Sequence, residues 1–199
     1  IMTYSLIIPI YNEERTLPTL LHKLGELQND NIEIIIIDDG SNDNTQNILR
    51  KETPFITLRN DVNKGKGASI KKAVKSAKNQ NIILIDGDLE IDINDVPNLI
   101  LKYENTKSDI LTGVRWGDQS NKQKYDINLL GNQIINFIFN VLFKSNFSDV
   151  LCCVKILNLK IFKFLNIQSS GFSIEVETMA KLVLNQFTIE ETSVKYIRR

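Results

Sequence analysis

Several residue types are scarce in this sequence, and each scarcity excludes a class of protein. The 199 residues include two cysteines, the adjacent Cys152 and Cys153, so we expect a reducing compartment and no disulfide framework. The longest apolar stretches, residues 32–37 and 134–143, fall short of the roughly 20 residues that span a bilayer. Basic and acidic residues number 24 each, and the resulting zero net charge offers no general attraction for nucleic acid.

The remaining composition is that of an ordinary globular protein. Hydrophobic residues make up 42% of the chain and charged residues 24%, which suffices for a sizeable core in a single domain over residues 1–199. Residues 1–10 lead directly into a strand pattern with no basic region before it, so we expect no signal peptide. These features favour a cytoplasmic protein.

Strand and helix patterns alternate along the chain. Short apolar runs indicate strands, and apolar residues at helical spacing indicate helices between them. This alternation predicts an α/β fold, a Rossmann-like open sheet of mostly parallel strands flanked by helices, with right-handed crossovers. The expected strands are residues 5–10, 32–37, 55–58, 82–85, 109–114 and 148–154, with an extended segment at 187–197. The expected helices include residues 94–103, 159–165 and 174–184.

In the stretch IILIDGDLE, residues 82–90, an aliphatic run leads directly into acids at alternate positions. The run predicts a buried strand, and Asp86, Asp88 and Glu90 follow where that strand emerges. Crowded carboxylates repel one another unless a cation lies among them, and hard oxygen ligands on a short loop suit Mg2+ or Mn2+. Such an ion completes its shell with substrate phosphates, so we expect a diphosphate ligand. A solvated acidic turn is the alternative interpretation.

Two other predicted strands end in polar residues of the same kind. Tyr11 and Glu13 follow the first strand, and Asp38 and Asp39 follow the second. Ligands of open α/β sheets lie outside the carboxyl ends of the strands. Because three separate strands carry acids to this one edge, a metal and nucleotide site is favoured over solvated turns.

The segment NKGKGAS superficially resembles a phosphate-binding loop. It lacks the GxxxxGK[ST] spacing, so a Walker motif is excluded. Gly65 and Gly67 are expected to allow a tight entry into the following helix, which places Lys64 or Lys66 near a bound donor.

Two segments of the second half have open interpretations. Residues 115–126 are polar and long enough to form a mobile lid or a disordered connection. Residues 130–143 carry a broad apolar face, which either packs on the core or lies against a membrane or a lipid acceptor.

The order of the motifs resembles that of family 2 glycosyltransferases with the GT-A fold. The motifs are SLIIPIYNEERTL, EIIIIDDGSNDNT, NKGKGASIKKAVKSAKN, IILIDGDLEID, DILTGVRWG, GNQIINFIFNVLF, SDVLCCVKIL and GFSIEVETMAK. They cover nearly the whole chain and are most similar to the branch of dolichol-phosphate mannose synthase and polyprenyl-phosphate sugar transferases. The resemblance implies a nucleotide-sugar-binding half at residues 1–115 and an acceptor-side half at residues 116–199.

The resemblance further implies an inverting, metal-dependent transfer of a hexose from a nucleotide diphosphate sugar, of the GDP-mannose or UDP-glucose type, to a polyprenyl or dolichyl phosphate. It implies Mg2+ or Mn2+ as cofactor, held by Asp88, Glu90 and Asp86. The implied catalytic residues are Asp88, Arg115 and Asp149. The implied donor-binding residues are Pro9, Tyr11, Glu13, Ile37, Asp39, Lys66, Asp86, Gly87, Asp88, Arg115 and Arg199.

Several alternatives stay open at this point. Arg115 could instead pair at the surface with Asp109 or Asp118. Asp149 would act as a general base toward a saccharide or protein hydroxyl, and as an orienting group toward a phosphate acceptor, or it forms a purely structural hydrogen bond. A further hypothesis for the function is an inactive nucleotide-sugar-binding module.

The expected cellular localisation of the protein follows from its lipid-linked acceptor. Relatives commonly continue beyond the position of Arg199, so either further sequence follows naturally or anchoring comes from a partner. We expect the protein at the cytosolic face of a membrane, through peripheral contact or a membrane-anchoring partner.

Overall fold

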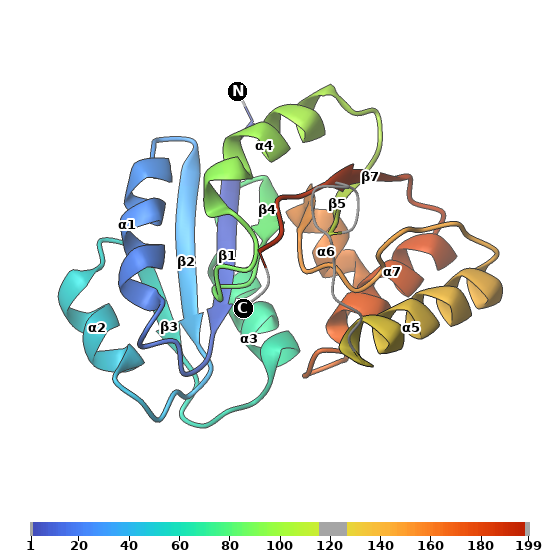
Figure 1. Ribbon diagram of the computed structural model, residues 1–199. Coiled ribbons are helices and arrows are strands. Elements are labelled where there is room, and N and C mark those ends of the chain that lie inside the picture. Colours follow the sequence, from blue (N-terminus) through green and yellow to red (C-terminus); the bar gives the residue numbers. More distant parts are fainter. Residues whose placement is uncertain (1, 116–126, 198–199) are drawn as a thin grey trace.

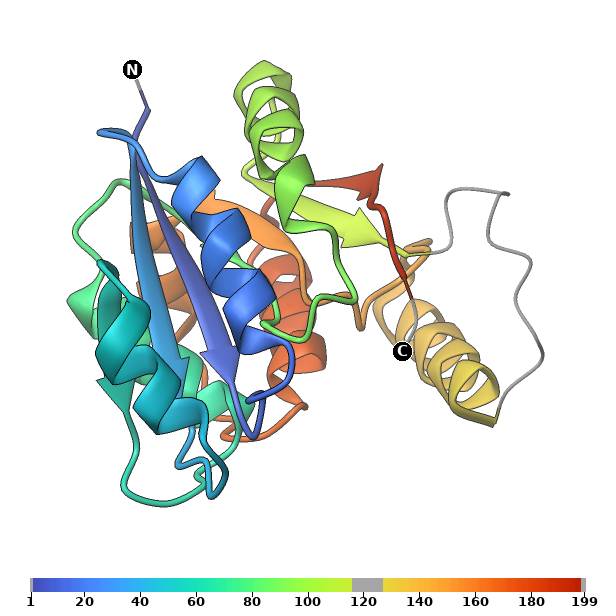
Figure 2. The ribbon, with the colours of Figure 1, turned by 60° about the vertical axis from the view of Figure 1, so that its left-hand side comes forward.

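The computed structural model describes residues 2–115 and 127–197 (Figures 1 and 2). Helices and strands alternate through most of the chain, as the sequence patterns predict. The strands are β1 (Tyr4–Ile10), β2 (Ile32–Asp38), β3 (Ile56–Arg59), β4 (Asn81–Leu84), β5 (Ile110–Val114), β6 (Lys155–Asn158) and β7 (Ile189–Ser193). The helices are α1 (Leu17–Leu27), α2 (Thr45–Glu52), α3 (Lys66–Ser76), α4 (Val96–Asn105), α5 (Ile127–Phe143), α6 (Leu159–Leu165) and α7 (Ile174–Leu184), with the 3-10 turn η1 (Ile93–Asp95) before α4.

The strands form one sheet in the order β3-β2-β1-β4-β6-β5-β7. Strands β1, β2, β3 and β4 are parallel, and β5 is parallel to β7. Strand β6 runs antiparallel to both of its neighbours, β4 and β5. The predicted open, mostly parallel sheet is therefore confirmed, with one reversed strand inserted between its two parallel sections.

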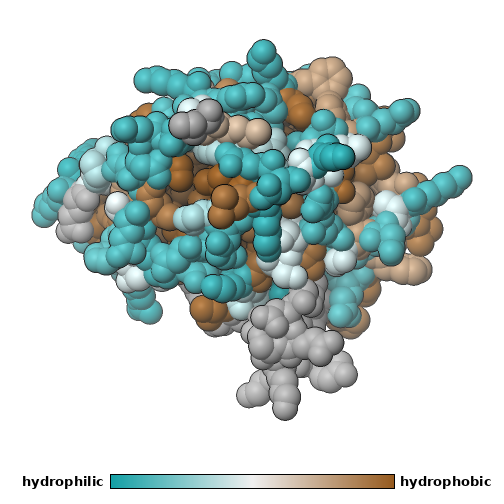
Figure 3. All heavy atoms as spheres, turned by 90° about the horizontal axis from the view of Figure 1, so that it is seen from above, coloured by the Kyte–Doolittle hydropathy of each residue, from teal (hydrophilic) through white to brown (hydrophobic). Residues whose placement is uncertain are grey.

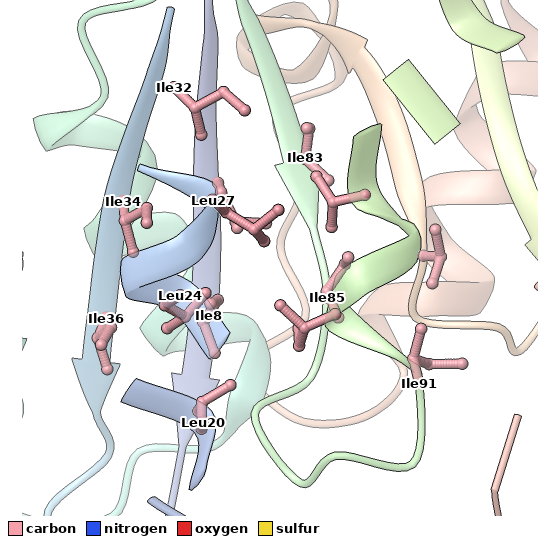
Figure 4. Packing of buried hydrophobic residues seen from close by; sticks show 14 of the residues in the cluster. Ile8, Leu20, Leu24, Leu27, Ile32, Ile34, Ile36, Ile83, Ile85 and Ile91 are labelled. Atoms are coloured by element: carbon pink, nitrogen blue, oxygen red, sulfur yellow. The ribbon is translucent and has the colours of Figure 1, made fainter. Parts of the chain in front are cut away.

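Hydrophobic side chains cover both faces of the central strands. In β2, Ile34 and Ile36 pack on one face while Ile35 and Ile37 pack on the other, because successive side chains of a strand alternate. Helices α1 and α4 cover the first face, and Figure 4 shows leucines of α1 lying against isoleucines of β1 and β2. The buried leucines of α1 recur at helical spacing and are Leu17, Leu20, Leu21, Leu24 and Leu27.

The opposite face is covered by α3, α6 and α7. Ile70 and Val74 of α3 pack with Met179 and Leu182 of α7 in the second hydrophobic cluster. Helix α5 contributes Phe139, which is 3% exposed, while many of its other apolar residues stay at the surface. Seen from the side of α4, polar atoms cover much of the surface, and hydrophobic atoms appear between them and at the margin toward α5 and α7 (Figure 3).

One predicted strand is wrong. Residues 148–154 form turns, and the strand begins only at Lys155. Side chains take the place of a strand partner here, because Val150 N–H donates to Asn136 Oδ1 (2.9 Å) and Ser148 N–H to Glu191 Oε1 (2.8 Å). Four apolar residues of this stretch are buried in the core, namely Val150, Cys152, Cys153 and Val154.

Among the described helices, none has both the length and the apolar character needed to cross a membrane. Cys152 and Cys153 are both buried and form no disulfide, as expected from their position in the chain.

Candidate active site

The carboxyl ends of β1, β2 and β4 meet at one edge of the sheet, the edge to which the arrowheads of β1 and β2 point in Figure 1. The loops beyond them are tied to one another by hydrogen bonds. Glu13 N–H donates to Thr45 Oγ1 (2.9 Å), and Gly87 N–H donates to Pro9 O (3.3 Å). The three acidic loops singled out in the sequence are therefore neighbours.

Asp39 holds the loop that leads into α3. Its Oδ1 accepts hydrogen bonds from Asn60 Nδ2 (2.8 Å) and Lys64 N–H (3.0 Å), and its Oδ2 accepts one from Gly65 N–H (2.7 Å). A carboxylate offers about four acceptor positions, so three bonds leave capacity for one further donor. The predicted contact to a nucleotide base is thus compatible with a carboxylate that also shapes the loop.

The other residues predicted around the nucleotide differ in exposure. Tyr11 is 40% exposed and Pro9 is half-buried at the end of β1. Ile37 is completely buried in a hydrophobic cluster, so its side chain is part of the core. The Glu13 carboxylate accepts a hydrogen bond from Thr16 Oγ1, which ties it to the start of α1.

Gly87 allows the acidic loop to lie directly on β1. A Cβ atom at this position would stand 2.3 Å from Ile10 Cγ2 and 2.9 Å from Ile8 Cγ2. Any larger residue would therefore lift the loop away from the strand. Close packing accounts for glycine between the two aspartates, in addition to its predicted role beside the diphosphate.

Lys66 lies among buried acids at this edge. Its Nζ is 2.6 Å from Asp86 Oδ1 and 2.7 Å from Glu175 Oε1. The second oxygen of Glu175 contacts Lys155 Nζ at 2.7 Å, and that ammonium also donates to Cys152 O (2.5 Å). The result is a chain of alternating charges that runs from β4 through α3 and α7 to the start of β6.

The pKa values of these groups reflect the pairing. Burial disfavours the charged form of Lys66, yet the carboxylates of Asp86 and Glu175 outweigh it and raise the pKa of Lys66. Burial alone would raise the pKa of Glu175, but Lys155 and Lys66 lower it. The two lysines thus favour the charged form of Glu175, and the ammonium of Lys66 also contacts a carboxylate of the predicted metal loop.

The two glycines at the start of α3 lie against a second loop. Gly65 has a φ of +90°, and a Cβ there would stand 2.5 Å from Ser170 O. A Cβ on Gly67 would stand 2.5 Å from Ser169 O, and Ala68 N–H donates to Ser170 O (2.9 Å). The backbone of residues 168–171 thus caps the N-terminal turn of α3, which confirms the predicted tight entry and fixes Lys66.

Asp88 and Glu90 are the two predicted metal ligands that follow Gly87 in the acidic loop. Glu90 N–H donates to Asp88 Oδ1 (3.0 Å), which closes a short turn that carries both acids. Within residues 2–115 and 127–197, no three His, Cys, Asp or Glu side chains form a metal-binding group, and Asp86 is paired with Lys66. Two hard carboxylates fit Mg2+ or Mn2+ when substrate phosphates and water complete the shell.

Arg115 and Asp149 form a bidentate pair. Arg115 Nε lies 2.8 Å from Asp149 Oδ2, and Nη2 lies 2.8 Å from Oδ1, while Arg115 N–H also donates to Oδ2 (3.2 Å). Burial opposes the charge of the guanidinium, but Asp149 outweighs it and raises the pKa of Arg115. Of the alternative partners, Asp109 accepts hydrogen bonds from Thr188, and Asp118 lies outside the described residues, as does Arg199.

Three residues of this region were missed as site residues by sequence reasoning. Glu175 could have been noticed, because it occupies an inward-facing position of a predicted helix, where a carboxylate needs a partner. Glu191 accepts hydrogen bonds from Ser148 N–H and Oγ, a contact that no sequence pattern signals. The guanidinium of Arg115 lies over the ring of Tyr196, and burial followed by the charge and hydrogen bond of Glu90 raises the pKa of Tyr196 to about 12.

Comparison with known proteins places this arrangement in a family. The model of glycosyl transferase family 2 matches residues 5–165. An uncharacterised protein of Methanocaldococcus jannaschii is 30% identical over 219 aligned positions, which cover 96% of this chain and 90% of the relative. The chain belongs to glycosyl transferase family 2, and it is a glycosyltransferase with the GT-A fold.

Other relatives and structures agree with this assignment. An undecaprenyl-phosphate 4-deoxy-4-formamido-L-arabinose transferase of Pseudomonas fluorescens is 32% identical over 50% of this chain, but the match spans only 32% of that enzyme. Glucosyl-3-phosphoglycerate synthase of Mycobacterium tuberculosis superposes with a TM-score of 0.78, at 15% identity, over 100% of this chain and 73% of that one. The same enzyme was also crystallised with Mn2+ and uridine diphosphate. At this level of identity the likeness shows the fold.

Proposed function

We propose that the protein transfers a hexose from a nucleotide diphosphate sugar to a polyprenyl phosphate, with inversion at the anomeric carbon. The bond between the sugar and the diphosphate breaks, and an oxygen of the acceptor phosphate forms the new bond. Residues 1–115 would bind the donor, and residues 116–199 would form the acceptor side. The arabinose transferases among the relatives support an undecaprenyl phosphate type of acceptor.

The donor site follows from the carboxyl edge of the sheet. Tyr11 and Asp39 would contact the nucleoside, and Lys66 and Asp86 would lie beside the donor. As the glycosidic bond breaks, negative charge grows on the leaving diphosphate, and cationic groups that meet this charge stabilise the transition state more than the ground state. A Mg2+ or Mn2+ ion held by Asp88 and Glu90 would supply such charge.

The pairing of Asp149 is the observation that carries the choice of acceptor. A hydroxyl acceptor must lose a proton to a base, whereas a phosphate acceptor is already an anion. Both oxygens of Asp149 are held by Arg115 at 2.8 Å, and the residue is only 3% exposed. Glu175 is likewise held by two lysines. Because both carboxylates are paired with cations, we assign them an orienting role and no role as a base. This supports a phosphate acceptor.

The pairing with Asp149 holds Arg115 in position to meet a phosphate. Its guanidinium is fixed on one edge by Asp149, and its pKa is raised, so it keeps its charge while phosphate binds. A preorganised guanidinium loses little freedom when it meets a phosphate oxygen. We assign it to the donor or acceptor phosphate, as the sequence motif suggests.

Helix α5 provides a surface suited to the lipid part of the acceptor. One face is held to the protein, since Asn136 and Asn140 donate to Phe147 O (2.8 Å each) and Phe139 is buried. The other face is apolar and exposed, and an apolar patch of this kind marks an interaction site. Its members are Leu130 (58% exposed), Ile134 (50%), Phe137 (69%), Ile138 (49%), Val141 (61%) and Leu142 (71%). We propose that this face rests on the membrane that holds the acceptor.

The function is tested by supplying labelled UDP-glucose and GDP-mannose with Mn2+ and either a polyprenyl phosphate or the matching polyprenol. Transfer of label into the organic phase is expected with the phosphate and absent with the alcohol. Transfer to the polyprenol or to a saccharide would instead identify a hydroxyl acceptor. Failure of any nucleotide to bind in the presence of metal would overturn the assignment of a donor site.

A further inference from the structure

The segment that follows β7 turns back against the acidic loop. Ile197 N–H donates to Glu90 O (2.7 Å), and Asp92 N–H donates to Lys195 O (3.1 Å). These bonds set Tyr196 opposite Ile91 in an antiparallel bridge. Residues 194–197 therefore form a short extended wall along the loop that carries the predicted metal ligands.

The side chain of Tyr196 contacts two predicted functional residues at once. Its hydroxyl is hydrogen-bonded to the carboxylate of Glu90. Its ring lies under the guanidinium of Arg115, whose Cζ is 5.8 Å from the ring centroid, within the range of a cation–π contact. The same guanidinium is held by Asp149 through its Nε and Nη2 atoms. A continuous row of contacts thus joins Glu90, Tyr196, Arg115 and Asp149.

We propose that Tyr196 is a positioning residue that sets the carboxylate of Glu90 and the guanidinium of Arg115 relative to each other. The hydrogen bond of the hydroxyl to the Glu90 carboxylate restricts the rotation of that carboxylate. The ring limits the tilt of the guanidinium, which Asp149 already holds at one edge. The charge that develops as the glycosidic bond breaks is best stabilised when Glu90 and Arg115 are held in position before the substrate binds. The contacts of Tyr196 hold both residues in this way.

This inference rests on the proposed function, because it gives Glu90 to a divalent ion and Arg115 to a phosphate. The hydrogen bond from Tyr196 then belongs to the outer shell of the metal site. Removal of such an outer partner typically lowers metal affinity about 10-fold to 100-fold. A contact that served only to hold the chain end would leave metal affinity unchanged.

The test compares Tyr196→Phe with Tyr103→Phe. Both variants remove one hydroxyl from a half-buried ring. The hydroxyl of Tyr103 donates to Asp109 O (3.4 Å), directly before β5. Binding of Mn2+ in the presence of UDP or GDP is followed by the loss of the free-ion signal in electron paramagnetic resonance. We expect Mn2+ affinity to fall about 10-fold in Tyr196→Phe and to stay within twofold of wild type in Tyr103→Phe.

A second variant separates the two contacts. Tyr196→Leu also removes the ring beneath Arg115, so kcat should fall beyond its value in Tyr196→Phe, whose effect should lie mainly in the KM for metal and donor. If the wild type binds Mn2+ with a nucleotide and Tyr196→Phe binds it equally well, the positioning role is overturned while the proposed function stands. If the wild type binds no Mn2+ with either nucleotide, the proposed function falls and the positioning role with it.

Discussion

Lys66 and Glu175 form a buried ion pair that joins the first turn of α3 to the first turn of α7, with Nζ 2.7 Å from Oε1. The pair connects the half of the chain that carries the nucleotide-binding loops to the half that follows β5. Because Lys66 also contacts Asp86 and Glu175 also contacts Lys155, neither half can move without disturbing a row of charges.

Glu175→Gln is expected to destabilise the protein strongly. The change leaves Lys155, whose side chain is 1% exposed, as a buried ammonium without a carboxylate, a situation that costs about 3 to 5 kcal/mol. Urea unfolding would measure the loss. The matched control is Glu33→Gln at the opposite edge of the sheet, where the carboxylate accepts a hydrogen bond from Ser5 Oγ (2.7 Å) and the cost should be about 1 kcal/mol. Equal losses in the two variants would contradict the account.

The row of charges also shows what sequence patterns could and could not predict. Crowding of Asp86, Asp88 and Glu90 was expected to demand a cation, and part of that demand is met by Lys66 from the chain itself. Lys64 or Lys66 is predicted near the donor because Gly65 and Gly67 allow a tight entry into the helix at this point. The second partner of Lys66, Glu175, lies far along the sequence, and no local pattern reveals a pair that only the folded topology brings together.

A similar limit applies to secondary structure. The ends of α6 and α7 agree with the predicted residues 159–165 and 174–184, because regular apolar spacing and one buried face determine them. The apolar content of residues 148–154 predicts a strand. In the structure, the side chains of Asn136 and Glu191 accept hydrogen bonds from its backbone N–H groups in place of a neighbouring strand. The composition of a segment gives no information about side chains of α5 and β7 that contact it only in the folded protein.

Arg115→Lys should lower kcat by about 100-fold to 1,000-fold. A lysine keeps the charge but cannot form the bidentate pair with Asp149 or present a planar fork to phosphate, and loss of one such group costs about 2.7 to 4 kcal/mol in the barrier. Steady-state kinetics with saturating donor would measure the change. A variant with nearly full kcat would show that the guanidinium does not meet the developing charge.

Asp149→Asn distinguishes orientation from base catalysis. If Asp149 only orients Arg115, the variant loses rate by a similar factor at every pH, since no proton passes through the carboxylate. If Asp149 were the base, the acidic limb of the rate profile would disappear in the variant. Measurement of kcat/KM between pH 5 and pH 9 in both proteins decides between these outcomes, and we expect parallel profiles.

Glu177 should make stability depend on pH in the acid range. Burial alone would raise its pKa, but hydrogen bonds from Lys181 and from the N–H groups of Gln168 and Ser169 lower the pKa from 4.5 to about 2. A lowered pKa stabilises the fold fully above pH 4.5, and this stability is lost as the pH falls toward 2. Urea midpoints of wild type and Glu177→Gln should therefore differ at pH 6 and converge near pH 2. A constant difference would contradict the assignment.

Gly67→Ala and Gly25→Ala should change stability in opposite directions. A Cβ at Gly67 would stand 2.5 Å from Ser169 O, so either α3 or residues 168–171 must shift, at a cost of about 1 to 3 kcal/mol. Gly25 lies within α1, where a Cβ atom would have no neighbour within 4 Å, and alanine there should stabilise the protein by about 0.5 to 1 kcal/mol. Thermal unfolding would detect both shifts, and a neutral Gly67→Ala would show that the two loops are not in close contact.

The apolar face of α5 should determine binding to lipid. A double change of Phe137→Asp and Val141→Asp places charges on side chains that are 69% and 61% exposed, so folding should be little affected. Each large apolar side chain that enters a membrane contributes about 1.5 to 3 kcal/mol, so sedimentation with neutral phospholipid vesicles should fall at least tenfold. The control, Leu101→Asp on α4, alters a leucine that is 56% exposed and should bind vesicles like the wild type. With a short, water-soluble prenyl phosphate the double variant should keep its turnover, because the change removes membrane contact and leaves the donor edge intact. Vesicle binding that survives the double change would assign the membrane contact to another surface.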